Sequence, residues 1–377
     1  MSYLERIVKA SAEVKLESDE LNYYSRHLLL PGVGTRGQLK LKAARVLVVG
    51  AGGLGCPVLS GLVGAGVGTL CIVDDDCVTA SNLARQWLHG HEAIGAAKVK
   101  SAQAALSARN PFVEIKAIRE RFTLGNGAQL CAGYDLVVDA TDSLHSREII
   151  DQVCAEIGCP WVHGALYRNS GQVAVLWPKK GARYAQLFAQ SGSESNCSEA
   201  GVLGAVASII GNLQALEVIK LITGLGQPLF GQLLTFDLLA QQLHTFSFAQ
   251  LDRIEPIFDT DQPVTNAYGI SVESLQQMRS IQTPVRLLEL RSEDSHPVDF
   301  GQTVESIEID QILTEGLAES GTAKAILICP SGSMSALLAE ALNSRNEVSV
   351  YYLEGGSAAW SEATMQSKKS PTTQTKD

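Results

Sequence analysis

The chain has 377 residues, of which 45% are hydrophobic and 19% are charged, and its formal net charge is −10. This length and hydrophobic content allow a substantial core and are typical of two globular domains. The negative charge argues against non-specific binding to nucleic acid or to an anionic membrane surface, because both attract basic patches. We therefore expect a partner that is not strongly acidic.

Cysteine use and the apolar runs indicate where the chain resides. The eight cysteines are scattered through apolar segments without a Cys-x-x-Cys pair, so we expect most of them to be reduced, buried and inert. The N-terminus lacks the long apolar run of a signal peptide. The most apolar run, residues 202–216, is shorter than the ~20 residues that span a bilayer. These features predict a cytoplasmic protein in which this run is a buried helix.

Apolar strands alternate with helical segments through the first half of the chain. Helices joining successive strands are typical of a parallel sheet, since parallel strands need crossover connections. The alternation predicts a doubly wound α/β sheet. The expected strands are residues 45–50, 69–76, 112–118, 134–142 and 160–166, and the expected helices are residues 54–66, 91–110 and 145–158.

The pattern becomes more irregular at residues 172–177, which lead through a polar loop into a long helix ending at Gly224. Prolines and acids without a sustained period indicate a linker after Phe248. A second, smaller α/β pattern follows, with strands at residues 285–291 and 325–330 and a helix at residues 335–346. The polar end of the chain is expected to be disordered. The predicted domains are residues 1–250, a linker at 251–268, a second domain at 269–363 and a disordered tail at 364–377.

A glycine-rich loop follows the first strand. Gly50, Gly52 and Gly55 have G-x-G-x-x-G spacing, with Gly53 beside them. Such a loop lets phosphates approach backbone N–H groups at the positive end of a helix. The loop alone is compatible with a nicotinamide or flavin site as well as with ATP.

Carboxylates end the second strand at Asp74, Asp75 and Asp76, about 20 residues after the glycines, where an acid binds ribose hydroxyls. This position also fits either kind of nucleotide. The two kinds are distinguished by the residues that follow the acids.

Two cations follow the acids. Arg85 lies between Asn82 and Gln86, and Lys98 begins the next helical segment. Such cations suit a triphosphate whose charge grows as pyrophosphate leaves, whereas hydride transfer does not require them. The alternative is that Arg85 and Lys98 are solvated surface residues.

Two further charged residues are candidates for the site. Asp142 ends a strand, where open α/β sheets place ligand-handling residues, and it fits either a magnesium ligand or a cap of the following helix. Arg26 lies upstream of the sheet and could reach its own site or, in a symmetric dimer, the site of a neighbour.

Residues 23–89, 135–147 and 196–224 closely resemble the ThiF/MoeB/HesA adenylyltransferases, relatives of the ubiquitin-activating enzymes. The resemblance covers roughly residues 21–248. It implies a Rossmann-like fold and a homodimer that uses ATP and Mg²⁺. The implied reaction adenylates the C-terminal glycine of a small ubiquitin-fold sulfur carrier of the ThiS/MoaD type, ending in Gly-Gly, and releases pyrophosphate. The implied pathways are thiamine, molybdopterin or related sulfur metabolism, with a cysteine desulfurase as a further candidate partner.

The resemblance also implies residue roles. By position, Gly52 and Gly55 line the phosphates, and the phosphates are bound by Asn82, Arg85 and Lys98. Asp76 binds the ribose and Asp142 binds magnesium. Arg26 is supplied to the site of the other subunit of the dimer, and Gln86 supports the pocket. A carboxylate is a poor nucleophile that phosphate oxygens repel, so the enzyme must neutralise the triphosphate and align the reactants. No general base is required, and we expect structural or solvent-facing roles for His89 and His163.

The sequence departs from the family at its usual zinc site. Members generally carry two C-x-x-C pairs, whereas Arg183 and Gln186 stand at the positions of the first pair and no pair follows the long helix. We therefore expect no structural zinc. Cys197 stands before the long helix, where a thiol pKa is lowered, and matches a cysteine that some relatives link to the carrier. The alternative for Cys197 is a passive loop thiol.

The C-terminal part, about residues 269–360, resembles a rhodanese domain through residues 326–342 and 350–360. Cys329 takes the catalytic position of that family. Pro330 and Met334 stand where arginine is common. The resemblance implies either sulfur transfer at Cys329 or a degenerate docking module.

Three other functions are compatible with parts of this pattern. An enzyme that adenylates a peptide or small carboxylate would have the same ATP site. A non-catalytic scaffold that binds the carrier would need neither Asp142 nor Arg85. An NAD oxidoreductase is the least compatible of the three, because hydride transfer does not require the cations Arg85 and Lys98.

Overall fold

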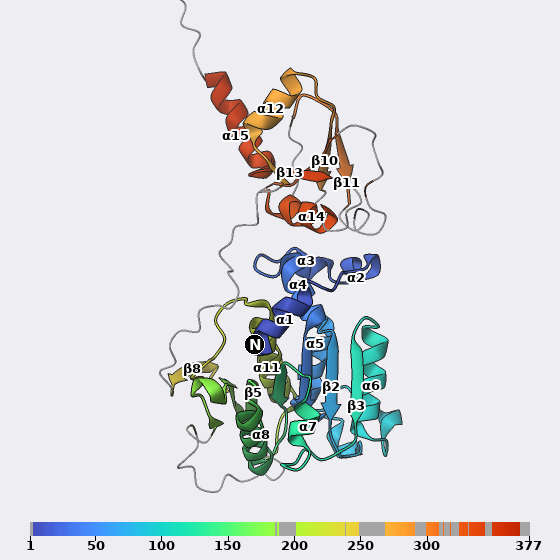
Figure 1. Cartoon of the computed structure of the whole chain (residues 1–377), viewed down its shortest axis with the longest axis vertical. Coiled ribbons are helices and arrows are strands. Elements are labelled where there is room, and N and C mark those ends of the chain that lie inside the picture. Colours follow the sequence, from blue (N-terminus) through green and yellow to red (C-terminus); the bar gives the residue numbers. More distant parts are fainter. Residues whose placement is uncertain are drawn as a thin grey trace, which may run out of the picture. The chain divides into compact units, whose positions relative to one another are not determined.

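The structure is a computed structural model that describes residues 3–184, 187, 201–237, 239–248, 268–290, 299–308, 312, 317, 324–330, 332–343 and 349–369. The chain divides into two compact units (Figure 1). Unit 1 comprises Met1–Lys15 and Arg36–Thr260, and unit 2 comprises Leu16–Thr35 and Asp261–Asp377. Residues 16–35, which the expected first domain included, are assigned to unit 2.

An eight-stranded sheet in the order β3-β2-β1-β4-β5-β6-β7-β8 forms the centre of unit 1. Neighbouring strands are parallel from β3 to β5 and antiparallel from β5 to β8. The strands are β1 (Arg45–Val49), β2 (Thr69–Val73), β3 (Glu114–Ile118), β4 (Leu136–Asp139), β5 (Trp161–Tyr167), β6 (Ser170–Leu176), β7 (Gln232–Asp237) and β8 (Gln242–Ser247).

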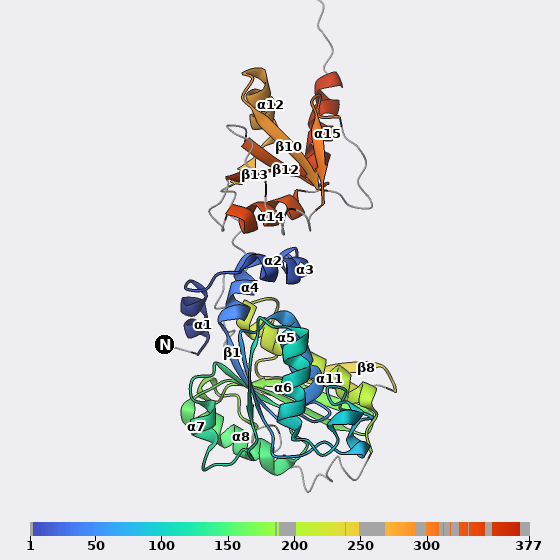
Figure 2. The same ribbon diagram turned by 90° about the vertical axis from the view of Figure 1, so that its right-hand side faces the viewer.

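Helices cover both faces of this sheet. The α-helices are α1 (Tyr3–Ser11), α4 (Gly34–Ala43), α5 (Gly55–Ala65), α6 (Lys98–Arg109), α7 (Gly127–Cys131), α8 (Leu144–Ile157) and α11 (Gly204–Thr223), and the short 3₁₀ helices are η1 (Ala80–Asn82), η2 (His91–Ala93) and η3 (Pro178–Lys180). Figure 2 shows α5, α6 and α11 on one side of the sheet and α7 and α8 on the other. Val46 and Val48 of β1 pack into the core with α5, α6 and α11, whereas Leu47 and Val49 pack into the core with α7 and α8. The predicted doubly wound α/β fold is confirmed.

Two sequence-based expectations in unit 1 are wrong. The helix expected at residues 91–110 begins only at Lys98, because Gly95 at φ +88° interrupts the chain after η2. Residues 172–177, which we expected to begin an irregular portion, lie largely in β6, which forms an antiparallel hairpin with β5. The hairpin turns at Arg168, which has φ +53°. This left-handed conformation is usual for glycine, so an arginine at the position gives no turn signal in the sequence.

The long helix α11 is a core element of unit 1. Among the described residues it is the one helix long and apolar enough to cross a membrane, and 56% of its apolar window is buried. It packs against α5, β5 and β6. Gly224 ends it in the left-handed conformation at φ +84°, at the predicted position. The expectation of a buried helix is therefore confirmed.

Unit 2 contains a parallel five-stranded sheet in the order β11-β10-β12-β13-β9. Its strands are β9 (Gly269–Ile270), β10 (Val285–Leu290), β11 (Val304–Ile307), β12 (Lys324–Ile328) and β13 (Val350–Leu353), and its α-helices are α2 (Ser18–Tyr23), α3 (Ser25–Leu28), α12 (Val272–Ser280), α14 (Ser333–Asn343) and α15 (Gly356–Lys369). The predicted second α/β pattern is confirmed. Most of the expected linker lies outside the described residues.

The end of the chain differs from the expected disordered tail. The helix α15 continues to Lys369, so the expectation of disorder is wrong for residues 364–369. The hydroxyl of Thr364 donates to the carbonyl of Trp360 at 2.7 Å, and the first proline that would stop the helix is Pro371. Residues 370–377 lie outside the described residues.

Candidate active site

The glycine loop after β1 depends on two glycines for its shape. Gly50 has φ +104°, and a Cβ there would lie 2.6 Å from the carbonyl oxygen of Ala140. A Cβ on Gly55, the first residue of α5, would collide with the carbonyl oxygen of Gly50. At Gly52 and Gly53 the nearest atoms are side-chain atoms at 3.6 Å and 3.5 Å from such a Cβ. Close backbone contacts therefore leave no room for a side chain at Gly50 and Gly55, whereas space remains above Gly52 and Gly53 in the middle of the loop.

A cavity of about 510 Å³ lies where the carboxyl ends of β1, β2 and β4 meet. Most of the predicted site residues line it: Gly50, Gly52, Gly53, Asp74, Asp76, Arg85, Gln86, Lys98 and Asp142. Gly55 and Asn82 are not in its lining. The tertiary structure thus brings together residues that the sequence spreads over about ninety positions.

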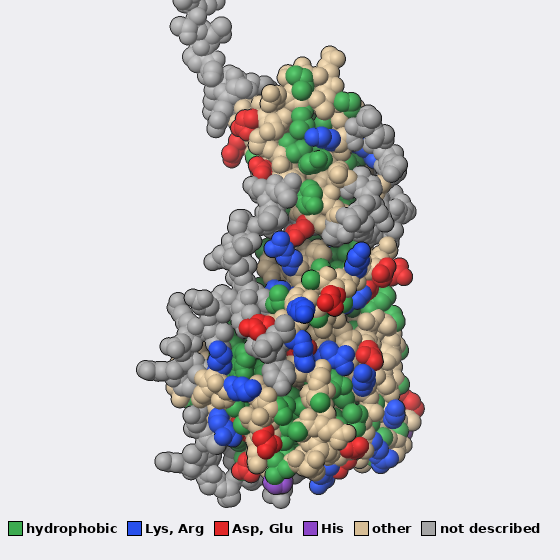
Figure 3. Space-filling view, viewed as in Figure 1, with side chains coloured by type: hydrophobic (Ala, Val, Ile, Leu, Met, Phe, Trp, Pro, Cys, Tyr) green, Lys and Arg blue, Asp and Glu red, His purple; other side chains and the backbone are tan. Residues whose placement is uncertain are grey.

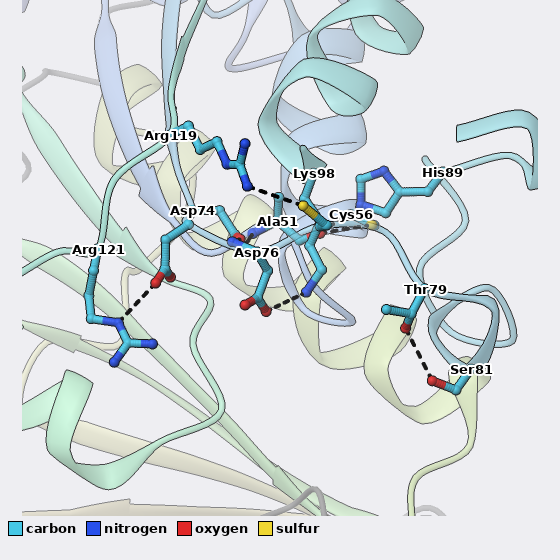
Figure 4. Close-up of polar contacts among 12 residues, drawn as sticks. Ala51, Cys56, Asp74, Asp76, Thr79, Ser81, His89, Lys98, Arg119 and Arg121 are labelled. Atoms are coloured by element: carbon cyan, nitrogen blue, oxygen red, sulfur yellow. Dashed lines mark hydrogen bonds and ion pairs between the residues drawn. The ribbon is translucent and has the colours of Figure 1, made fainter. Parts of the chain in front are cut away.

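The three consecutive acids have different partners. Asp74 accepts from the N–H groups of Ala51 and Asp76, each at 2.8 Å, so both of its carboxylate oxygens hold the backbone. Asp75 accepts from Nε of Arg121 at 3.0 Å. Asp76 accepts from Nζ of Lys98 at 2.8 Å (Figure 4). Asp74 therefore fixes the glycine loop, while Asp76 presents a side chain that is 64% exposed.

The cations approach the loop from two elements. Lys98 begins α6 and its side chain is 7% exposed, whereas Arg85 donates to the carbonyl of Ser81 at 3.0 Å. The Cγ and Cδ atoms of Arg85 lie 3.7 Å from a Cβ built on Gly53. Gln86 is buried beside Gly52, and its Oε1 atom has no hydrogen-bond partner among the described residues. These side chains line the same cavity as the open part of the loop and give it polar groups and positive charge.

His89 connects the glycine loop to α6. Its Nε2 atom lies 2.9 Å from the carbonyl oxygen of Ala51, which can only accept (Figure 4). Its Nδ1 atom lies 3.0 Å from Oγ of Ser101. Nε2 therefore carries a hydrogen, and in the neutral ring Nδ1 accepts from the hydroxyl. Burial lowers the pKa of His89. These contacts give His89 the structural role that we expected.

The sequence allows Asp142 to be either a magnesium ligand or the cap of the following helix. Ser143 is the N-cap of α8 and accepts from the N–H of Ser146 at 3.0 Å. Asp142 is exposed and lines the cavity. The interpretation of Asp142 as the helix cap is wrong, because the next residue caps the helix.

Sequence reasoning did not single out the acid at the end of β4, Asp139. Its side chain is fully buried and lies 3.6 Å from Nε of Arg147 and 3.3 Å from Nδ1 of His163. Arg147 also lines the cavity. The one available signal was the first aspartate in VVDATDS, three residues before Asp142.

Arg26 is a further predicted residue that is absent from the lining of this cavity. It lies in α3 of unit 2. Cys197 and Gln186 lie outside the described residues. Arg183 donates from Nη2 to Oδ2 of Asp151 at 3.1 Å, so an ion pair with α8 occupies one position where the family usually has a cysteine.

Cys329 directly follows β12 in unit 2 and is 2% exposed. Its sulfur lies 3.4 Å from both the N–H and the hydroxyl of Ser335, near the start of α14. Gly332 has φ +79°, and a Cβ there would lie 2.8 Å from the nitrogen of Gly355. The predicted strand, loop and helix around Cys329 are thus present in the structure.

Most of the other described cysteines are buried free thiols, as expected: Cys56, Cys71, Cys131, Cys154 and Cys159. Burial raises the pKa of each of these thiols, to about 11 for Cys56 and about 12 for Cys131. They are therefore protonated and unreactive at neutral pH.

Comparison with known proteins identifies relatives for most of the chain. The model of the ThiF family matches residues 24–254. The probable adenylyltransferase/sulfurtransferase MoeZ of Mycobacterium tuberculosis is 33% identical over 373 residues, which cover 92% of this chain and 94% of that protein. The sulfur carrier protein adenylyltransferase of Thermus thermophilus is 44% identical over 229 residues, or 59% of this chain and 84% of that protein.

A crystal structure of E. coli MccB with a form of MccA has a TM-score of 0.55 to this structure at 21% sequence identity. The match covers 61% of this chain and 72% of the MccB chain. At this identity the match shows a shared fold.

Proposed function

The chain belongs to the ThiF family, and from that premise we propose that it is an ATP-dependent adenylyltransferase. Its substrate is the C-terminal glycine carboxylate of a ubiquitin-like sulfur carrier ending in Gly-Gly, and pyrophosphate is the other product. The observation that carries the proposal is a single cavity in which an open glycine loop meets Lys98, Arg85 and the exposed carboxylates Asp76 and Asp142. The name of the Thermus relative supports a sulfur carrier as substrate.

The residues of the cavity fit a nucleoside triphosphate. The missing Cβ atoms at Gly52 and Gly53 leave space for phosphates at the positive end of α5. Arg85 and Lys98 would bind the phosphates with Asn82 nearby, and Asp76 would bind the ribose. The buried Oε1 of Gln86 has no partner in the part of the chain that the structure describes, so it marks a polar position that a ligand or its water can satisfy.

Asp142 fits a magnesium ion, because Mg²⁺ prefers oxygen ligands and this exposed carboxylate lines the same cavity. Bound beside the triphosphate, the ion would neutralise charge on the departing pyrophosphate. Asp142 is therefore proposed as its protein ligand.

The chemistry that remains for the chain is alignment and charge neutralisation. The substrate carboxylate is already ionised, so its oxygen attacks the α-phosphorus without a base, and the bond to the β-phosphate oxygen breaks. Lys98 and Arg85 reduce the repulsion between the carboxylate and the phosphates and stabilise the charge that grows on pyrophosphate. Arg26, supplied by a second copy of the chain, is proposed to add a further cation.

We propose a homodimer in the cytoplasm, where thiols stay reduced. Ile209 and Leu216 are 39% and 44% exposed on α11, and Leu203 before this helix is 60% exposed. Large apolar side chains at this spacing on one helix are typical of a surface that a partner covers. The charges on the face of unit 1 in Figure 3 are mixed, with red and blue side chains interspersed, which favours protein partners over nucleic acid.

For unit 2 we propose that Cys329 carries sulfur, which a cysteine desulfurase could supply. The similarity to MoeZ extends over 92% of the chain and its name includes sulfurtransferase, which supports a second activity. Cys197 is proposed as the residue that links covalently to the carrier. In place of zinc, the Arg183–Asp151 ion pair is proposed to brace α8.

The test is pyrophosphate release from ATP and Mg²⁺ in the presence of carrier proteins that end in Gly-Gly. We expect release that depends on the carrier, stops when its last glycine is removed, and is lost in Asp142→Ala. The matched control is Glu148→Ala, which removes an exposed acid of α8 that is not in the cavity lining. ATP binding without release for any carrier would overturn the proposal.

A further inference from the structure

Asp139, the last residue of β4, is a buried carboxylate that the proposed chemistry does not use. Its Oδ1 atom accepts from the N–H of Thr141 at 3.0 Å and from the hydroxyl of Thr141 at 2.6 Å. Its Oδ2 atom lies 3.3 Å from Nδ1 of His163 and 3.6 Å from Nε of Arg147. One carboxylate therefore contacts a turn, a helix and a neighbouring strand.

The cost of burying this acid indicates that it has a specific role. An ionised carboxylate away from water loses several kcal/mol of hydration, which only good hydrogen bonds and a counter-charge offset. Arg147 supplies the counter-charge with a side chain that is 4% exposed. The sequence thus places a charged pair where an apolar pair of similar volume would also pack.

The same pair holds Thr141 from both sides. Asp139 binds the N–H and the hydroxyl of Thr141, and Nη2 of Arg147 donates to its carbonyl at 3.5 Å. Asp142 follows Thr141 directly, and Ser143 then caps α8. The backbone of Asp142 is consequently fixed at both of its neighbours.

The turn is also attached to the glycine loop and to α11. The carbonyl oxygen of Ala140 lies 2.6 Å from the position of a Cβ on Gly50, so the two backbones pack directly. The carbonyl of Asp139 accepts from Nε2 of Gln214 at 2.6 Å, and Gln214 is fully buried. The glycine loop and α11 therefore also restrain the turn that carries Asp142.

We propose that Asp139 is a positioning residue that holds Asp142 in place to bind the metal of the nucleotide complex. The inference rests on the proposed function only in its identification of Asp142 as the metal ligand. Asp139 itself does not touch the nucleotide. Weakening its contacts should lower metal affinity and turnover while leaving the affinity for metal-free ATP unchanged.

The test uses Thr141→Val, which keeps the shape of Thr141 and its N–H bond to Asp139 but removes the hydroxyl that donates to Asp139, with Thr141→Ser as the matched control. Binding of Mn²⁺ to the ATP-saturated protein is measured by electron paramagnetic resonance, beside metal-free ATP affinity and the Mg²⁺ dependence of pyrophosphate release. We expect Thr141→Val to weaken Mn²⁺ binding about tenfold, the effect of losing one hydrogen bond to a charged group. Thr141→Ser should recover most of that loss.

Asp139→Asn extends the test and should weaken Mn²⁺ binding more than Thr141→Val. If it does not fold, the Thr141 pair still decides the question. Wild-type Mn²⁺ affinity in Thr141→Val, or an equal loss of metal-free ATP binding, would overturn the proposal. If the wild type binds Mn²⁺ and ATP but releases no pyrophosphate, adenylation fails while the positioning role is still decided by the Mn²⁺ measurements.

Discussion

The two loops that carry the proposed chemistry are built in the same way. The glycine loop follows the buried strand β1 and precedes α5, and the Cys329 loop follows the buried strand β12 and precedes α14. Each has a glycine in the left-handed region, Gly50 at φ +104° and Gly332 at φ +79°, packed against backbone from another segment. Both loops present the start of a helix at the carboxyl ends of parallel strands.

The loops differ in the side chains that other elements bring to them. The glycine loop is flanked by Lys98, Arg85 and Asp142, whereas the sulfur of Cys329 has Ser335 as its described polar neighbour. The backbone geometry is thus common to both, and the charge supplied from distant segments distinguishes a phosphate site from a thiol site. The four predictions that follow test this difference.

The largest effect is expected from Gly50→Ala. The new methyl group would face the carbonyl of Ala140 at a φ that alanine rarely adopts. Left-handed strain and overpacking each cost about 1–3 kcal/mol, so the free energy of unfolding should fall by about 2–6 kcal/mol and ATP binding should be lost. Urea denaturation and calorimetric titration with ATP measure both.

Gly64→Ala is the matched control within α5. A Cβ there meets no atom within 4 Å, and alanine in a helix is favoured over glycine by about 0.5–1 kcal/mol. Equal losses in both variants would mean that the close backbone approach at Gly50 does not shape the site.

A large effect on rate is expected from Lys98→Gln. Loss of one preorganised positive group should slow carrier-dependent pyrophosphate release about 10²–10³-fold, by analogy with the loss of an oxyanion-hole donor. Lys100→Gln removes an exposed lysine of the same helix that bonds to Gln103, and it should leave the rate unchanged. Similar rates in the two variants would show that charge over the glycine loop is not what drives the reaction.

A smaller effect is expected from pH. Because the folded-state pKa of His89 is lowered, the unfolded chain binds the proton more readily below the usual histidine pKa of about 6.5. The contribution of His89 to stability is therefore present above that pH and decreases as the pH falls, by at most about 1.4 kcal/mol per pH unit.

The pH prediction is checked by denaturation at pH 7.5 and pH 5.5. His89→Gln should reduce the loss of stability between these two conditions, whereas the exposed His91→Gln should not. An undiminished loss in His89→Gln would assign the pH dependence to other groups.

The smallest effect on adenylation is expected from Cys329→Ser. This variant changes one buried atom in unit 2, so carrier-dependent pyrophosphate release should be unchanged while sulfur transfer to the carrier is lost. Thiocarboxylate formation on the carrier, followed by mass spectrometry, measures the second activity. Unimpaired sulfur transfer would leave unit 2 as a docking module.

Much of the fold could be predicted because its signals are local. The apolar strands near residues 45, 69 and 285 and the helix stop at Gly224 follow from periodicity and backbone preference, which neighbouring residues determine. The strand β6 was missed because its hairpin turns at Arg168, which gives no glycine signal. The start of α6 was misplaced because Gly95 interrupts a stretch with otherwise helical composition.

The sequence by itself determined the glycine spacing, the cations and the acids at the strand ends, because these are properties of consecutive residues. Only the tertiary structure decided the role of each acid. Asp74 and Asp139 accept hydrogen bonds from other groups of the protein, while Asp76 and Asp142 are exposed at the cavity. The physical reason is that a carboxylate's partners come from other segments: strand pairing sets Val138 beside Val162, and hence Asp139 near His163, which no local pattern encodes.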